Sequence, residues 1–257
     1  MKRILLSFAI AAFALHAQAE IVTKTVEYKQ GGKTFEGFVA YDDVVNITAK
    51  PGVLVTHDWL GITDNTKERA QELAKLGYVA FAVDVYGKGI RPTREEAGKL
   101  AGEYKKDRKL LRQRMEAGLK QLRAQKGVDK KRVGVIGYCF GGTAALELAR
   151  SGADVRGVVS FHGGLDSPTP ADGKKIKAKV LALHGADDPF VKPEDLAAFE
   201  TELRDSKVDY QIVKYGNAVH SFTDKNAGTD NSKGAAYNPA AATRSWQAMQ
   251  DFFTEAL

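Results

Sequence analysis

The chain has 257 residues, a formal net charge of +6 and a single cysteine, Cys139. The mild positive charge comes without a basic stripe interleaved with aromatic residues, which single-strand binding would need, so the composition argues against a nucleic-acid-binding protein. A single cysteine also excludes an intramolecular disulfide.

The first 19 residues have the pattern of a secretory signal peptide. Lys2 and Arg3 precede an apolar run over residues 4–15, and Ala17-Gln18-Ala19 follows with a small residue at each end. The alternative is a structured N-terminal helix. We expect cleavage after Ala19 and export, most simply to a bacterial periplasm. No later segment approaches the roughly 20 apolar residues that span a bilayer, so we do not expect a membrane-embedded protein.

Residues 20–257 have the size of one α/β domain, and we expect a single domain and a monomer. Polar and apolar residues alternate over 21–28 and again over 34–41, and turn residues occupy 30–33. This pattern predicts an antiparallel hairpin. The next apolar run, 53–56, is typical of a buried parallel strand.

A helix capped by Thr63 or Asp64 and a strand over 78–83 are expected next. A long helical region then extends from about Thr93 to Gln125, with its apolar residues close to helical period. The basic residues between them are expected to form a solvated face rather than a functional patch. They are Lys105, Lys106, Arg108, Lys109, Arg112 and Arg114.

The second half of the chain alternates strands with helices. Strands are expected over 133–136, 155–161, 179–183 and 208–215, and helices over 143–150, 193–206 and 239–253. This order predicts an α/β protein with a mostly parallel central sheet covered by helices on both faces. Ligands bind beyond the carboxyl ends of such strands. The polar residues expected there are His57, Asp58, Lys88, Cys139, His162, Asp188 and His220.

The segment Gly137-Tyr138-Cys139-Phe140-Gly141-Gly142 lies between a buried strand and a helix. A strand, a sharp glycine-rich turn and a helix form the nucleophile elbow, and here Cys139 occupies the nucleophile position. The motif alone leaves a second reading open, because a lone cysteine is often a small buried apolar residue.

A nucleophile needs a base to take its proton and an acid to orient that base. Cys139, Asp188 and His220 occur in the chain order nucleophile, acid, histidine, each after a predicted strand. Between two adjacent carboxylates we favour Asp188 over Asp187, because the following Pro189 fixes the turn. We therefore predict a Cys-His-Asp triad.

Two backbone N–H groups are predicted to form the oxyanion hole. The first belongs to Phe140, the residue after the nucleophile, and the second to Trp59, after the third strand. The remaining strand-end histidines, His57, His162 and His184, are expected to pack loops or support the site. No H-x-x-x-H spacing and no cysteine pair is present, so neither a metal site nor a cofactor is predicted.

Three segments resemble the dienelactone hydrolase family of the α/β-hydrolase fold: residues 137–142, His184-Gly185-Ala186-Asp187-Asp188-Pro189 and Ala218-Val219-His220-Ser221-Phe222. The resemblance implies the same triad. It also implies that Asp58, where the family prototype has a glutamate, contacts the resting thiol; a structural loop carboxylate is the alternative. It further implies substrate binding at Lys88, where the prototype has an arginine, and at the nearby Tyr86.

We therefore predict an exported, cofactor-independent hydrolase that cleaves carboxylic esters or lactones through an acyl-thioenzyme on Cys139. Two alternatives remain. The first is a non-catalytic relative that binds a small molecule at the same site. The second is a redox-sensing protein, suggested by a lone cysteine in an exported chain.

Overall fold

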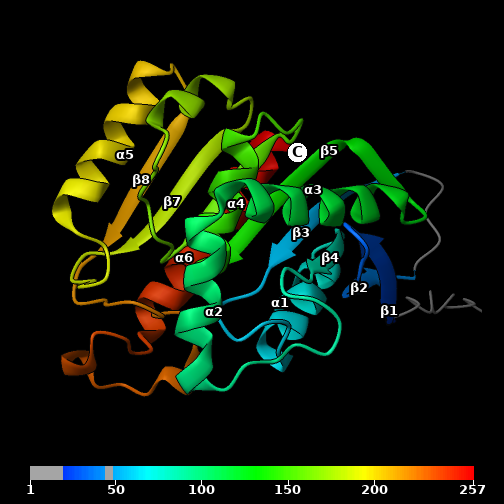
Figure 1. Cartoon of the computed structure of the whole chain (residues 1–257), viewed down its shortest axis with the longest axis horizontal. Helices are drawn as coiled ribbons and strands as arrows, with labels where there is room; N and C mark the ends of the chain where they lie inside the picture. The colour runs from blue at the N-terminus through cyan, green and yellow to red at the C-terminus, as the bar shows by residue number, and fades with distance from the viewer. Residues whose placement is uncertain (1–19, 44–48) are drawn as a thin grey trace, which may run out of the picture.

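The computed structural model describes residues 20–43 and 49–257. The predicted signal peptide, residues 1–19, lies outside the described residues. Within the described residues eight strands form one sheet, with the order β1-β2-β4-β3-β5-β6-β7-β8 (Figure 1). Among the described helices, none combines the length and the apolar character needed to cross a membrane.

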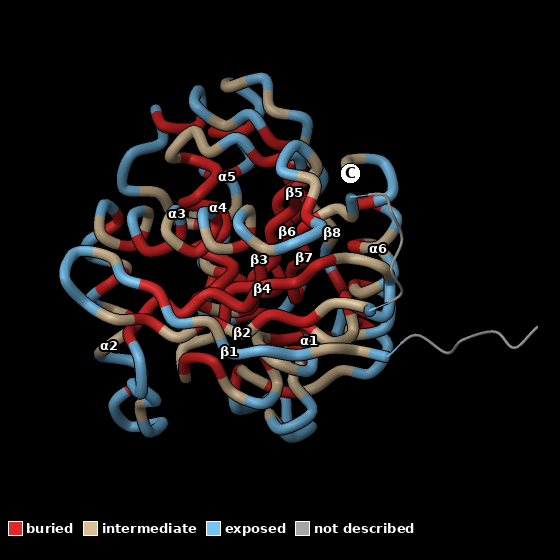
Figure 2. The backbone as a smooth tube through the Cα atoms, turned by 90° about the vertical axis from the view of Figure 1, so that its right-hand side faces the viewer, coloured by how far each residue is buried: buried red, intermediate tan, exposed pale blue. Residues whose placement is uncertain are grey.

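The predicted hairpin at the start of the sheet is confirmed. Strand β1 (Ile21–Gln30) pairs antiparallel with β2 (Lys33–Asp42) around a two-residue turn, Gly31-Gly32. Strand β2 then joins the rest of the sheet by an antiparallel pairing with β4 (Val79–Val83). The outer strand β1 is largely exposed or half-buried, whereas the central strands are buried (Figure 2).

From β4 to β8 every pairing is parallel, as predicted. The remaining strands are β3 (Lys50–Thr56), β5 (Val128–Tyr138), β6 (Gly157–Phe161), β7 (Lys179–Gly185) and β8 (Tyr210–Tyr215). Because these strands are parallel, their carboxyl ends all lie at one edge of the sheet.

Successive residues of a strand point to opposite faces, and the two faces of this sheet carry separate apolar cores. Leu54 of β3 belongs to the core that contains α3 (Arg108–Ala124), α4 (Phe140–Arg150) and α5 (Pro193–Asp205). Its neighbours Val53 and Val55 belong to the core that contains α1 (Asp64–Lys75) and α6 (Pro239–Ala256). Helices therefore cover both faces, as predicted.

The helical region predicted from about Thr93 to Gln125 is present and is interrupted once. Two helices occupy this region, α2 (Arg94–Lys106) and α3, and they meet at Asp107 with φ −100° and ψ 74°. The Asp107 carboxylate accepts a hydrogen bond from Leu110 N, so it caps α3 instead of continuing α2. Figure 1 shows α2 leaving the direction of α3 at this point.

The solvated face predicted for the basic residues of this region is wrong in part. Arg108 and Arg114 are buried, with exposed fractions of 8% and 4%. Arg108 pairs with Asp166 and Glu147. Arg114 stacks on the ring of Phe35 at 4.5 Å and donates a hydrogen bond to a carbonyl at the hairpin turn. These partners lie far away in the sequence, so helical spacing alone could not indicate them.

Candidate active site

The carboxyl ends of the parallel strands surround a cavity of about 540 Å³. Cys139 and His220 line it together with Asp58, Trp59 and Phe140. These five residues follow three different strands, β3, β5 and β8. Because the carboxyl ends of parallel strands lie at one edge of the sheet, these residues lie around one cavity, as expected.

Cys139 lies in a strained turn between β5 and α4. Its φ of 54° and ψ of −117° are unusual for a residue with a side chain, and such strain is typical of functional sites. Two glycines permit the turn. A Cβ on Gly137 would lie 1.9 Å from the Gly141 carbonyl oxygen, and one on Gly141 would lie 2.4 Å from the His57 carbonyl oxygen. The turn is the predicted nucleophile elbow.

His220 and Asp188, predicted as base and acid, are joined by a hydrogen bond. Nδ1 of His220 lies 2.8 Å from Oδ2 of Asp188, whose other oxygen accepts the Phe190 N–H at 2.8 Å. Asp188 is buried and Asp187 is exposed, so Asp188 is the carboxylate that orients the imidazole. Because Nδ1 is engaged, Nε2 is the nitrogen available to the nucleophile.

The electrostatics of His220 favour its protonated form. Burial on its own would lower the pKa of His220, but the negative charge and hydrogen bonding of Cys139 and Asp188 outweigh burial and raise this pKa to about 10. A protonated imidazole beside a cysteine is an arrangement that favours nucleophilic thiolates in proteins. The arrangement can therefore supply a nucleophile at neutral pH.

Two backbone N–H groups at the cavity are free of protein acceptors within the described part of the chain. They belong to Phe140, at the N-terminus of α4, and to Trp59, in the loop after β3. The Trp59 carbonyl accepts a hydrogen bond from the Tyr86 hydroxyl at 3.0 Å, which fixes this loop. Free N–H groups beside a nucleophile can stabilise an oxyanion.

Asp58 lines the cavity, and its hydrogen bond stays within its own loop. Its Oδ1 accepts the Leu60 N–H at 2.8 Å. Burial raises the pKa of Asp58 to about 6. The preceding His57 is buried and fixed, because its Nε2 accepts the Val85 N–H at 3.2 Å and its Nδ1 donates to the Asp58 carbonyl at 2.6 Å. This loop is held firmly on both sides.

The two predicted substrate-binding residues do not reach the cavity lining. Lys88 lies on the surface, where its ammonium pairs with Glu27 of β1. Tyr86 is 1% exposed and directs its hydroxyl to the Trp59 carbonyl. Lys88 therefore lies apart from the cavity, and Tyr86 holds the loop that contains Trp59.

The cavity has two walls that the sequence did not indicate. One is α2, which contributes Arg94 and Lys105. The other is the loop over residues 223–238, which contains two short 3-10 helices, Lys225–Ala227 and Asn231–Lys233. This loop returns to the segment after β8 through an isolated β-bridge between His220 and Ala235. Helical spacing in α2 gave no sign that its charged side faces a cavity.

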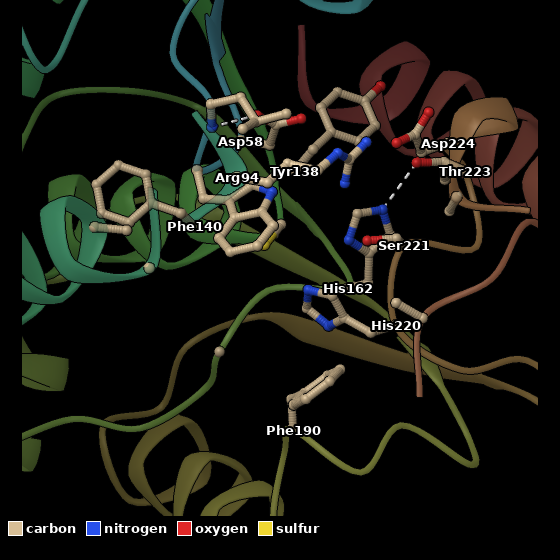
Figure 3. A pocket seen from close by; sticks show the side chains of 18 of the residues that line it. Asp58, Arg94, Tyr138, Phe140, His162, Phe190, His220, Ser221, Thr223 and Asp224 are labelled. Carbon is tan, nitrogen blue, oxygen red and sulfur yellow. Dashed lines mark hydrogen bonds between the residues drawn. The ribbon is translucent and has the colours of Figure 1, made fainter. Parts of the chain in front are cut away.

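A second histidine, His162, lies against the first. Its ring centroid is 5.3 Å from that of His220, and its Nε2 lies 2.8 Å from the Thr223 hydroxyl (Figure 3). Burial and the neighbouring His220 hold the pKa of His162 well below its usual value, so it is neutral. His184 is also buried. Across residues 20–43 and 49–257, no three His, Cys, Asp or Glu side chains cluster so as to hold a metal ion.

A mostly parallel sheet with helices on both faces and a nucleophile elbow defines the α/β-hydrolase fold. Residues 35–257 match the model of the dienelactone hydrolase family, and the chain belongs to that family. It is therefore a hydrolase that acts on esters or lactones.

Three relatives illustrate the range of this family. The chain is 40% identical to the solved protein "m3DLH", with a TM-score of 0.88 over 92% of this chain and 99% of that one. It is also 40% identical to a dienelactone hydrolase-like promiscuous phosphotriesterase from metagenomic libraries, with a TM-score of 0.87 over 92% and 98%. A probable 2-oxo-3-(5-oxofuran-2-ylidene)propanoate lactonase of a Bradyrhizobium species is 30% identical over 87% of this chain and 92% of its own length.

Proposed function

We propose that the protein hydrolyses carboxylic esters or lactones through a triad of Cys139, His220 and Asp188. The observation that carries the proposal is the His220–Asp188 hydrogen bond of 2.8 Å, together with the pKa of about 10 that Cys139 and Asp188 give to His220 against the effect of burial. A histidine held in this way is the base that a cysteine nucleophile needs.

In the first half-reaction the Cys139 thiolate attacks the ester carbonyl carbon. The carbonyl oxygen becomes an oxyanion that accepts hydrogen bonds from the N–H groups of Phe140 and Trp59. The tetrahedral intermediate collapses, the bond to the leaving oxygen breaks, and His220 gives its proton to that oxygen. The acyl group remains on the sulfur as a thioester.

In the second half-reaction water replaces the alcohol. Neutral His220 takes a proton from the water as the water oxygen attacks the thioester carbonyl, and the same two N–H groups stabilise the new oxyanion. Collapse releases the carboxylic acid and the thiolate, while His220 keeps the proton. Asp188 holds the imidazole in one tautomer through both halves.

Asp58 is proposed to be the partner of the resting thiol. Its place in the wall of the cavity that Cys139 also lines and its pKa of about 6 support a carboxyl that changes its ionisation near neutral pH. The Asp58→Asn substitution keeps the acceptor for Leu60 N. A changed rate of Cys139 alkylation in this variant supports the role, and an unchanged rate leaves Asp58 as a loop carboxylate only.

The test of the proposed function is a panel of activated esters and lactones with the Cys139→Ala variant as control. Turnover by the native protein and its loss in a folded variant are expected. Retained activity in the variant would contradict the mechanism. Labelling of Cys139 by an ester without turnover would instead favour a non-catalytic binding protein, and faster reaction with peroxide than with any ester would favour a redox sensor.

A second candidate activity is the hydrolysis of phosphotriesters, because one relative of 40% identity is a promiscuous phosphotriesterase. The same thiolate and oxyanion donors suit attack at a neutral phosphorus centre. A neutral aryl phosphotriester tested beside the esters, again with Cys139→Ala as control, decides this point. Release of the aryl alcohol by the native protein alone supports the activity, and no release removes it.

Export and a monomeric state are part of the proposal. The basic, apolar and small-residue order of residues 1–19 supports a signal peptide. N-terminal sequencing of the periplasmic protein should begin at Glu20, and an intact N-terminus in the cytoplasm would contradict export. Light scattering should give the mass of one chain, and twice that mass would contradict a monomer.

A further inference from the structure

Phe190 is an exposed aromatic residue at the cavity. In the described part of the chain its exposed fraction of 62% exceeds the 43% of the two other exposed large apolar residues, Leu76 and Ile90. Single exposed apolar side chains are common on protein surfaces. Phe190 differs because it lines the same cavity as Cys139 and His220.

The position of Phe190 is fixed by its surroundings. Its N–H donates to Asp188 Oδ1 at 2.8 Å. On the other side Gly234, with φ 76°, lets the loop over residues 223–238 approach closely, since a Cβ there would lie 2.8 Å from Pro189 Cγ and 3.2 Å from Phe190 Cζ. The ring therefore keeps its place without being covered.

The same ring packs against the catalytic histidine. The centroids of Phe190 and His220 are 5.3 Å apart, and the planes are inclined at 84°, an edge-to-face contact. Because Asp188 engages Nδ1 of His220, the Nε2 edge is the part that faces the reacting atoms. Phe190 thus packs on the histidine that is proposed to transfer protons.

Three charged side chains of the cavity and the Phe190 ring lie on opposite sides of His220. Figure 3 shows Asp58, Arg94 and Asp224 gathered on one side and Phe190 on the other, with His220 between them. The residue next to Phe190, Val191, adds apolar surface to the cavity lining. A substrate with an apolar group and a polar group is therefore oriented by the cavity itself.

The chemistry decides which part of the ester lies near Phe190. In the proposed mechanism His220 donates its proton to the leaving oxygen, which must come within hydrogen-bond distance of Nε2, about 2.6–3.2 Å. The group carried by that oxygen then lies next to whatever packs on His220. Within the described residues, two rings pack on His220. Of these, His162 is buried with an exposed fraction of 3%, whereas Phe190 is exposed, so Phe190 is the ring that can receive the alcohol part of the ester.

We propose that Phe190 forms an apolar subsite for the leaving alcohol and determines a preference for esters of arylalkyl alcohols. This inference rests on the proposed ester hydrolysis. An aromatic ring on the alcohol stacks on or meets the edge of Phe190 and is removed from water, whereas a small alkyl alcohol leaves the ring exposed.

The experiment compares kcat/KM of the native protein and Phe190→Ala for three esters: benzyl acetate, ethyl acetate and ethyl phenylacetate. Dividing variant by native for each ester removes differences in intrinsic reactivity. Losing an aromatic contact and its buried area should lower kcat/KM for benzyl acetate by about tenfold, and for the two ethyl esters by about twofold or less. Phe190→Tyr keeps the ring and should stay within about twofold of native.

Two controls separate specificity from damage. Leu76→Ala removes another exposed apolar side chain, far along the chain from the site, and should change none of the ratios. The rate of Cys139 alkylation should be the same in Phe190→Ala and native protein if the triad is intact.

The outcomes separate a failure of the proposed ester hydrolysis from a failure of the Phe190 subsite. If the native protein cleaves none of the esters, the proposed function fails and this inference fails with it. If the native protein cleaves them but Phe190→Ala lowers all three by one factor, or lowers ethyl phenylacetate selectively, only the subsite is refuted. An equal loss of kcat/KM for all three esters would mean that Phe190 only supports His220. A selective loss for ethyl phenylacetate would mean that the acyl part of the ester lies next to Phe190.

Discussion

The neighbouring carboxylates Asp187 and Asp188 have different environments. Asp188 is buried and bonded to His220 Nδ1, whereas Asp187 is exposed one residue earlier. Asp188→Asn removes the charge that stabilises the imidazolium and permits the wrong tautomer, so kcat should fall by about 100-fold or more. Steady-state kinetics on an activated ester measure the effect.

Asp187→Asn is the matched control for that substitution, because it removes a charge next door without touching His220. It should keep kcat within about twofold, as expected of a surface change. If both variants lost the same factor, the effect would be one of local charge, and the assignment of Asp188 as the triad acid would be contradicted.

Asp58 links the cavity to the pH dependence of stability. Burial raises its pKa from 3.8 to about 6 in the folded protein. Between these two values the folded state holds a proton that the unfolded state has lost, so stability falls as pH rises and reaches its full penalty above pH 6. Asp58→Asn cannot ionise and keeps the acceptor for Leu60 N.

The Asp58→Asn variant should therefore be more stable than the native protein at pH 8, by about 1–3 kcal/mol, and equal to it below pH 3.8. Urea unfolding at the two pH values gives the comparison. A stability difference that does not change with pH would show that the Asp58 carboxyl is not titrating as described.

At the scale of the element, the break between α2 and α3 shapes the cavity. Asp107 caps α3, and α2 turns away to place Arg94 and Lys105 on the cavity wall. Asp107→Ala should cost about 1 kcal/mol of unfolding free energy. It should also raise KM, because the orientation of α2 relative to α3 is no longer fixed. Asp107→Ser retains a capping oxygen and should recover most of both in the same assays. A loss of stability with an unchanged KM would show that the Asp107 cap stabilises α3 without affecting the cavity.

Elements whose structure depends on residues nearby in the sequence could be predicted, whereas those that depend on residues far away in the sequence could not. The elbow around Cys139 depends on glycines within two residues, and the alternation of strands and helices is also local, so both could be predicted from the sequence. The break at Asp107 competes with an uninterrupted helical stripe, and nothing nearby decides between them. The family resemblance implied substrate binding at Lys88, and its ion pair with Glu27 of the distant hairpin could not be read from the local sequence.

At the scale of the molecule, a buried ion-pair network ties the nucleophile helix to its surroundings. Arg150, at the end of α4, is fully buried and binds Glu202 of α5 through two hydrogen bonds of 2.9 Å and 2.6 Å. It also donates to Glu147 at 3.0 Å. The helix that begins beside Cys139 is thus anchored at its other end.

Arg150→Met should destabilise the protein by about 3–5 kcal/mol, because the buried Glu202 loses its arginine, whereas Glu147 keeps Arg108 and Arg112. Chemical denaturation measures this, and Arg204→Met, which removes an exposed arginine from α5, should cost less than about 0.5 kcal/mol. Similar small losses in both variants would show that the network adds little to the fold.

The central claim concerns a covalent bond between Cys139 and the acyl group of the substrate. Mixing the enzyme with an activated ester, quenching in acid within milliseconds and measuring the intact mass should reveal a thioester adduct. Peptide mapping should locate it at Cys139, and its formation and decay should be as fast as turnover. Full turnover with no adduct on Cys139, or with an adduct that decays more slowly than kcat, would contradict the proposed mechanism.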